Sequence, residues 1–206
     1  MEGKIVYFDN PGAENTEEVL RIAKARAEEL GIKNIVVATT RGDTGARAVE
    51  VFEGMKVVVV THVTGMREPD TQELTEENRR KIKSKGGILL TTAHPFTGIE
   101  GAMRKKFNMH LLGDVIANTL FVLGQGIKVV CEISLMAADA GLVRTDEDVI
   151  AIAGTGRGAD TAVVLKPVNS MNFFDLRIKE ILCKPYISVA RPRPQPGQPS
   201  TEGRPR

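Results

Sequence analysis

Short, continuously apolar runs, separated by longer segments with helical spacing, constrain the fold of this chain more than any other feature. The runs cover residues 35–38, 57–60, 88–90 and 149–153. Apolar side chains in consecutive positions are typical of strands that are buried on both faces of a parallel sheet. We therefore expect an α/β fold with three layers, α/β/α, and a mostly parallel sheet.

Apolar residues recur at helical spacing between these runs. The first such segment follows Asn15, which lies three residues before Glu18 as in a capping box, and it ends at Gly31. Thr75 is expected to cap a helix with an acidic first turn and a basic last turn. Further helices are expected over residues 46–52, 109–123 and 127–140.

The remaining segments complete the expected fold. Residues 5–8 and 162–165 resemble strands, and Asn172 or Asp175 is expected to open a last amphipathic helix through Ile178, Ile181 and Leu182. Residues 96–106 fit no element clearly. With 206 residues, the chain is long enough for one α/β domain, which we assign to residues 1–187. Residues 188–206 are rich in Pro and Arg and are expected to be disordered.

Composition narrows the possible functions. A formal net charge of +2, no Trp and the lack of a basic stripe argue against nucleic-acid binding. No apolar run approaches the roughly 20 residues of a membrane span, and the first residues lack the shape of a signal peptide. Cys131 and Cys183 lie in apolar runs with helical spacing and are expected to be reduced core residues. These features predict a cytoplasmic protein without a membrane segment.

Four polar loops follow expected strands, where an open α/β sheet binds its ligands. They span residues 39–45, 61–65, 91–94 and 154–161 and are rich in Thr and Gly, which suit an anion because Gly permits close backbone approach and Thr adds a compact donor. The alternative is that they are simple tight turns. The candidate ligand-binding residues are Thr39, Thr40, Arg41, Gly42, Asp43, Thr44, Gly45, His62, Thr64, Gly65, His94, Gly154, Thr155, Gly156, Arg157, Gly158, Ala159, Asp160 and Thr161.

The loop over residues 39–45 is the best candidate for a phosphate site. It lies between a strand and a helix, so it offers backbone N–H groups and the positive end of a helix dipole. Arg41 here and Arg157 in the last loop are each either a phosphate contact or an exposed turn residue. Asp43 and Asp160 either accept hydrogen bonds from a sugar or ring, or cap local turns.

The loop over residues 154–161 matches the pattern G-x-G-x-x-A of dinucleotide-binding folds. The segment that follows resembles a strand rather than a helix, and the motif lies late in the chain. A Rossmann site is therefore not expected. No sequence of the form G-x-x-x-x-G-K-[ST] exists, so a phosphate-loop nucleoside triphosphatase is not expected either.

Two histidines, His62 and His94, follow expected strands and are candidate general bases. No partner carboxylate lies at a recognisable spacing from either. His110 is expected to be structural, and Glu132 and Asp139 are expected to be exposed or capping residues. No metal-ligand spacing rises above background, so no metal is predicted.

The chain resembles the C-terminal regulatory domain of pyruvate kinase, and still more a group of small stand-alone prokaryotic proteins with that fold. The resemblance rests on residues 39–45, 62–65, 130–141 and 154–161. It implies that the first loop holds a phosphate, that the last loop lies beside a ribityl chain or ring, and that flavin mononucleotide is the cofactor. No catalytic barrel is present, so kinase activity is not implied. Residues 96–126 form an insert that is a candidate crevice cover or a contact in a homo-oligomer.

Three functions remain open at this point. The first is a binding protein for a phosphorylated small molecule, with flavin mononucleotide as the leading ligand. The second is a flavin-dependent or sugar-phosphate enzyme that uses His62 or His94 as its proton carrier. The third is a non-catalytic regulatory module that senses a sugar phosphate.

Overall fold

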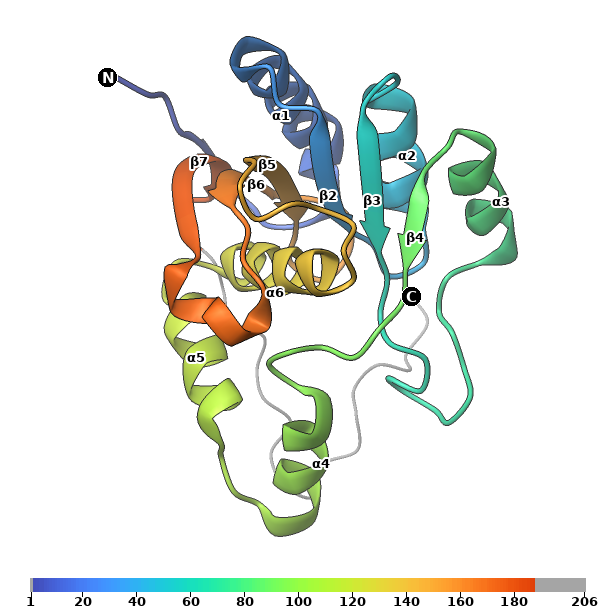
Figure 1. Cartoon of the computed structure of the whole chain (residues 1–206), viewed down its shortest axis with the longest axis vertical. Coiled ribbons are helices and arrows are strands. Elements are labelled where there is room, and N and C mark those ends of the chain that lie inside the picture. Colours follow the sequence, from blue (N-terminus) through green and yellow to red (C-terminus); the bar gives the residue numbers. More distant parts are fainter. Residues whose placement is uncertain (1, 188–206) are drawn as a thin grey trace.

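A mixed sheet of seven strands forms the centre of the structure (Figure 1). The computed structural model describes residues 2–187, so the predicted tail over 188–206 lies outside the described part. The sheet order is β1-β7-β6-β5-β2-β3-β4. The strands are β1 (Val6–Phe8), β2 (Asn34–Ala38), β3 (Lys56–Val60), β4 (Ile88–Leu90), β5 (Val149–Ala153), β6 (Thr161–Lys166) and β7 (Arg177–Pro185).

Six α-helices and two 3₁₀ turns connect these strands within the described residues. The helices are α1 (Thr16–Leu30), α2 (Asp43–Val51), α3 (Glu76–Ser84), α4 (Gly98–Phe107), α5 (Leu112–Phe121) and α6 (Gln125–Asp139). The 3₁₀ turns are η1 (Ala13–Asn15) and η2 (Ser170–Asp175).

The expected three layers and mostly parallel sheet are confirmed. Ile35 and Val37 of β2 pack into one core with α1, α2 and α3, whereas Val36 packs into a second core with α6. Successive side chains of a strand point to opposite faces, so a run that is apolar in every position can supply both cores. Within residues 2–187, β6 is the only strand that runs against the others.

The predicted C-terminal helix is wrong. Ile178, Ile181 and Leu182 belong to β7, which pairs with β6 on one side and β1 on the other. Cys183, also expected in a helical run, lies in the same strand opposite Ala162 and Val6. Backbone pairing on both edges decided the conformation here, and it depends on strands that are distant in sequence.

Of the two predicted helix caps, one forms and the other does not. Thr75 caps α3 as expected, since its hydroxyl accepts a hydrogen bond from the Asn78 N–H (3.3 Å). The capping box of Asn15 does not form, because the Asn15 amide donates to the carbonyls of Asn10 (2.8 Å) and Gly12 (3.2 Å). Gly31 ends α1 in the left-handed conformation, as predicted.

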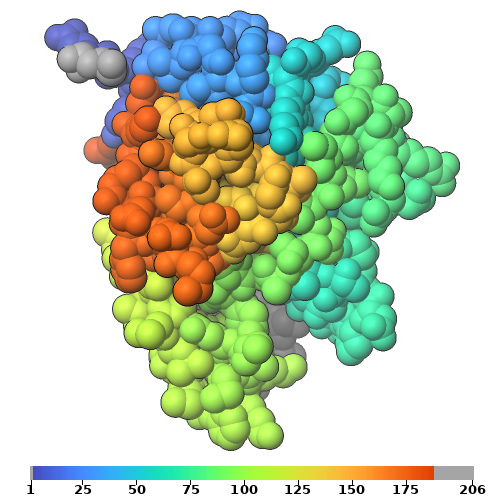
Figure 2. Space-filling view, viewed as in Figure 1, coloured from blue at the N-terminus to red at the C-terminus, as the bar shows by residue number. Residues whose placement is uncertain are grey.

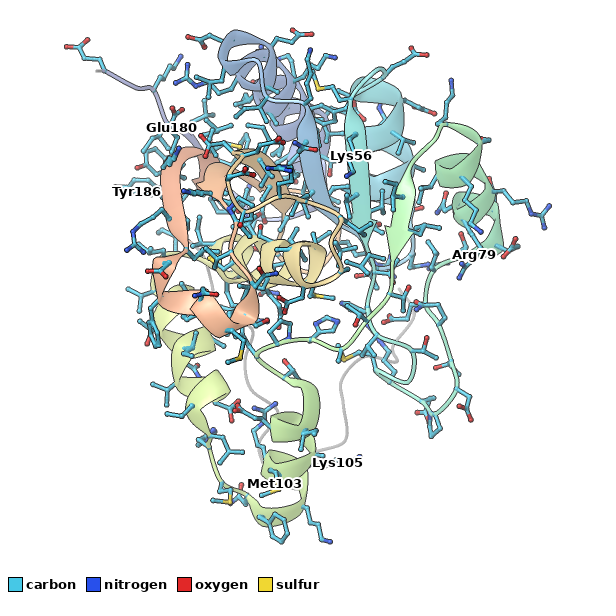
Figure 3. All side chains as sticks on the ribbon, viewed as in Figure 1. Lys56, Arg79, Met103, Lys105, Glu180 and Tyr186 are labelled. Carbon is cyan, nitrogen blue, oxygen red and sulfur yellow. The ribbon has the colours of Figure 1, made fainter. Side chains whose placement is uncertain are left out.

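The insert folds into α4 and α5, which project from the sheet as an arm (Figures 1 and 2). Figure 3 marks Met103 and Lys105 on this arm, far from Lys56 at the first residue of β3. The arm therefore extends beyond the edge at which the parallel strands end. That edge also carries the predicted loops.

The strand order brings the first and last of these loops together. β2 lies between β5 and β3, and Val37 of β2 is in register with Ile152 of β5. Because β2 and β5 are parallel neighbours, the loops that follow Ala38 and Ala153 start side by side. The chain continues from β2 towards β3 on one side and adds β5 on the other, which is a switch point of the kind where α/β folds bind ligands.

Candidate functional site

A cavity of about 790 Å³ opens at the carboxyl ends of β2, β3 and β5. Its wall combines the loop after β2, the segment between β3 and α3, the segment after β4, the first turns of α6 and the loop after β5. The volume lies within the roughly 300–1,000 Å³ of small-molecule sites. All four predicted loops therefore contribute to one cavity.

The loop after β2 is held in place by α3. The Arg41 carbonyl accepts hydrogen bonds from the Thr75 N–H (3.2 Å) and the Asn78 side-chain amide (3.1 Å). The same amide donates to Asp43 (2.9 Å), so Asp43 serves to tie α2 to α3. With its carbonyl fixed in this way, Arg41 is presented from a rigid loop rather than a mobile one.

Two glycines of this loop serve packing. Gly42 has φ 102°, and a Cβ there would lie 2.4 Å from the Asn78 Cβ. A Cβ on Gly45 would lie 2.5 Å from the Val59 side chain, so only Gly lets α2 approach β3 this closely. Thr39 is buried, and its hydroxyl accepts the N–H of Gly42 (3.1 Å) and Gly45 (3.4 Å).

Asp160 organises the loop after β5 from inside the protein. It is fully buried and accepts the N–H groups of Gly12 (3.0 Å) and Thr155 (2.9 Å) and the Thr161 hydroxyl (2.8 Å). The bonds from Thr155 and Thr161 are the local capping predicted as one alternative for this residue, whereas the bond from Gly12 ties the loop to the turn before α1. Gly158 contacts the turn before α1, where a Cβ would lie 2.4 Å from the Ala13 Cα.

Four cations and three carboxylates line the cavity: Arg41, Arg67, Lys128 and Arg157, with Asp43, Glu73 and Glu132. Arg67 pairs with Glu73 (2.9 Å) and Lys128 with Glu132 (2.5 Å). The guanidinium groups of Arg41 and Arg157 have no side-chain partner among residues 2–187. Two guanidinium groups in one cavity have the charge and the donors that suit an anionic ligand.

His62 has a partner that sequence reasoning did not find. Its Nδ1 lies 2.6 Å from the Glu73 carboxylate, whose other oxygen accepts from Arg67. The ring is about one-third exposed and lines the cavity. A carboxylate at Nδ1 favours the tautomer with its proton there, which leaves Nε2 as an acceptor.

The ring nitrogens of His94 have different partners from those of His62, although the two ring centroids are only 5.8 Å apart. Its Nε2 accepts the N–H of Val63 (3.2 Å), so its Nδ1 carries the proton of the neutral ring. That nitrogen lies 3.6 Å from the Glu132 carboxylate. The acceptor lone pair of His94 is therefore occupied.

Glu132 was predicted to be exposed or capping, and this is wrong: it is 3% exposed. It lies one turn after Lys128 on α6, and both side chains line the cavity. Burial raises the pKa of Glu132, but nearby His94 and the Lys128 ammonium outweigh it, so the pKa lies below its usual value. Asp139 does cap, since it accepts the Ser170 N–H (2.9 Å) at the start of η2.

Only some of the predicted ligand-binding residues line the cavity. The predicted residues that line it are Thr39, Thr40, Arg41, Asp43, Thr44, His62, His94, Gly154, Gly156, Arg157 and Gly158. Gly42, Gly45, Thr155, Ala159, Asp160 and Thr161 support the loops from behind, and Thr64 and Gly65 are exposed beside it. The charged residues missed are Arg67, Glu73, Lys128 and Glu132. Lys128 and Glu132 lie four residues apart in a segment with helical spacing, so their pairing could have been predicted. Nothing in the sequence around Glu73 indicates that it lines the cavity.

Other features of the described residues bear on the predictions. No described helix has the length and apolar character needed to cross a membrane. Residues 2–187 contain no group of three or more His, Cys, Asp or Glu side chains placed to hold a metal ion. Cys131 and Cys183 are free and buried, and burial raises the pKa of each thiol to about 12. His110 is exposed, 3.7 Å from Asp114.

Comparison with known proteins gives one family and a set of similar folds. The family described as pyruvate kinase, alpha/beta domain matches residues 17–165. A pyruvate kinase from Cryptosporidium parvum aligns with a TM-score of 0.40 and 15% identity over 74% of this chain and 23% of its own. A Cryptosporidium parvum pyruvate kinase in complex with ADP aligns with a TM-score of 0.38 and 16% identity, again over 74% of this chain and 23% of its own. The chain thus spans less than a quarter of the length of these enzymes.

Proposed function

The chain belongs to the pyruvate kinase, alpha/beta domain family, and on this fold we propose that it binds a phosphorylated small molecule, with flavin mononucleotide as the ligand. The observation that carries the proposal is the pair of arginines, Arg41 and Arg157, that line one cavity and whose guanidinium groups have no side-chain partner within the described residues 2–187. Arg41 lies one residue before the N-cap of α2, whose dipole adds to the attraction for a phosphate.

The apolar side chains that line the cavity support the choice of a flavin. Val129 and Ile133 of α6 line the cavity together with Val60 and Met66. An apolar wall suits a flat ring system, and the threonine hydroxyls of the first loop suit a polyol chain. A ligand with phosphate, polyol and ring would therefore match the three kinds of surface in the cavity.

Calorimetric titration with flavin mononucleotide and with riboflavin tests the proposal. The phosphate should improve affinity, and Arg41→Gln or Arg157→Gln should each weaken flavin mononucleotide binding about 10- to 100-fold, the worth of one charge-assisted hydrogen bond. Arg144→Gln is the matched control, because Arg144 is exposed and precedes β5 at the other edge of the sheet. Equal affinity for the two flavins would show that the phosphate does not contribute to binding. No binding of either flavin would rule out flavin mononucleotide as the ligand.

A further inference from the structure

We propose that the cavity is also a catalytic site, in which His62 takes a proton from a phosphorylated carbonyl compound such as a sugar phosphate. The proposal rests on the proposed function only for its phosphate end, at Arg41 and Arg157. It concerns what the remaining polar groups of the cavity do to a molecule held there.

The two histidines differ in the one property that a general base needs. His62 presents a ring whose Nδ1 is engaged by Glu73 at 2.6 Å and whose Nε2 has no partner among residues 2–187. The Nε2 of His94 already accepts the Val63 N–H. Because a proton acceptor needs a free lone pair at the substrate, His62 qualifies and His94 does not.

Glu73 is the positioning residue of this pair. It is itself fixed, because its second oxygen accepts from Arg67 at 2.9 Å. The backbone carbonyl of His62 accepts from the Gln72 side chain (3.0 Å), so the segment before α3 holds His62 at two points. A carboxylate that orients an imidazole and stabilises its charged form is the arrangement used in His-dependent proton transfer.

Proton removal places negative charge on the carbonyl oxygen of the substrate, and Lys128, beyond His94, is the cation that can stabilise it. The His94 ring contacts His62, and its Nδ1 faces Glu132, which binds Lys128. Lys128 is 12% exposed and lines the same cavity. One of its three N–H donors is used by Glu132, so others remain for a carbonyl oxygen.

The proposed step is balanced within the substrate and the protein. Nε2 of His62 takes the proton from the carbon next to the carbonyl, and the C–H electron pair becomes the new C=C bond. The carbonyl π pair moves to oxygen, where the Lys128 ammonium stabilises it. The hydroxyl proton on the attacked carbon then moves to the former carbonyl oxygen, the O–H electron pair forms the new carbonyl at the attacked carbon, and the C=C pair takes the proton back from His62 at the former carbonyl carbon. This completes an isomerisation, and no oxidant or reductant is consumed.

The test is exchange of carbon-bound hydrogen with solvent. The purified chain is incubated in D₂O with dihydroxyacetone phosphate, ribose 5-phosphate or fructose 6-phosphate, and loss of the proton signal next to the carbonyl is followed by NMR. At least one compound should exchange faster than in buffer. His62→Asn should lower that rate at least about 100-fold, the usual worth of a general base.

The variants are chosen so that a folding defect is recognisable. In His62→Asn the amide replaces Nδ1 and can still donate to Glu73, so the thermal midpoint should stay the same while Nε2 is lost. Glu73→Gln should lower the exchange rate at saturating ligand and leave the half-saturating concentration unchanged, which a purely structural role would not do. His110→Asn, on the exposed arm, is the control for contaminating enzymes and should exchange normally.

The outcomes separate the two proposals. Exchange that survives in His62→Asn overturns this inference, and so does the lack of exchange with all three compounds when flavin mononucleotide binds. His62-dependent exchange in a chain that does not bind flavin mononucleotide supports this inference and removes the flavin from the proposed function.

Discussion

The buried pair of Lys128 and Glu132 gives the sharpest prediction for stability. Lys128→Met keeps the length of the side chain but leaves the Glu132 carboxylate, only 3% exposed, without its cation. Removal of one partner from a buried pair typically costs about 3–5 kcal/mol. Because one kcal/mol shifts the thermal midpoint of a chain of this size by about 2–4 °C, the midpoint should fall by roughly 6–20 °C.

The double variant Lys128→Met/Glu132→Leu should recover nearly all of this loss. An apolar pair of similar volume removes both desolvated charges together, so its free energy of unfolding should lie within about 1–2 kcal/mol of the wild type, or above it. Urea unfolding followed by circular dichroism measures all of these values. Lys179→Met is the control: Lys179 is 47% exposed and pairs with Asp148, so its loss should cost less than about 1 kcal/mol.

The pH dependence of the single variant provides a second check. In the wild type the pKa of Glu132 is lowered, so this group contributes stability above its unfolded value of about 4.5 that is lost as pH falls through the folded pKa. Without Lys128, only His94 offsets the burial of Glu132, so we expect the pKa of Glu132 to rise and the loss of stability relative to wild type to shrink as pH falls. A Lys128→Met protein as stable as wild type at pH 7, or a double variant as unstable as the single one, would refute the reasoning.

Three further predictions concern the fold. Cys131 and Cys183 should not react with a thiol reagent at pH 8 until the protein unfolds, since each thiol is buried with a pKa of about 12. Gly45→Ala should cost about 1–3 kcal/mol in urea unfolding because its Cβ meets Val59, and an unchanged midpoint would contradict this. Glu180→Gln should cost about 1 kcal/mol at pH 7, because the Arg26 guanidinium holds the pKa of Glu180 below its usual value of 4.5, and the cost should disappear as pH falls through that lowered pKa and the carboxylate is protonated.

The sequence predicts those strands best whose pattern is local. β3 and β5 are apolar in nearly every position, so their burial on both faces follows from the residues themselves. β7 alternates instead between exposed and half-buried residues over its first half, and its isoleucines at 178 and 181 fit helical spacing as well. Only its pairing with β6 and β1 decides between these readings, and that pairing is not written in any local pattern.

The same distinction applies to the cavity. The loop after β2 was predictable because strand, polar loop and helix follow one another directly in the chain. The partners of the histidines were not, since His62 and Glu73 are joined by an irregular segment, and His94 and Glu132 are 38 positions apart. Contacts of this kind depend on how α3 and α6 dock against the sheet, which periodicity does not encode.

The direction of β6 explains why a literal G-x-G-x-x-A motif does not form a dinucleotide site here. The loop over residues 154–160 joins β5 to an antiparallel neighbour, so no helix begins at its end. Its glycines permit tight turns at Gly156 and Gly158 and close contact with Ala13, and it brings no helix dipole to a phosphate. The helix dipoles at this cavity are those of α2 and α6, and of α3 and α4, whose N-cap residues Thr75 and Thr97 line it. Of these, α2 begins beside Arg41, whose guanidinium has no side-chain partner in the described part of the chain, whereas Lys128 in the first turns of α6 is already paired with Glu132. We therefore expect a phosphate at the α2 end beside Arg41, with Arg157 lining the same cavity from the neighbouring loop.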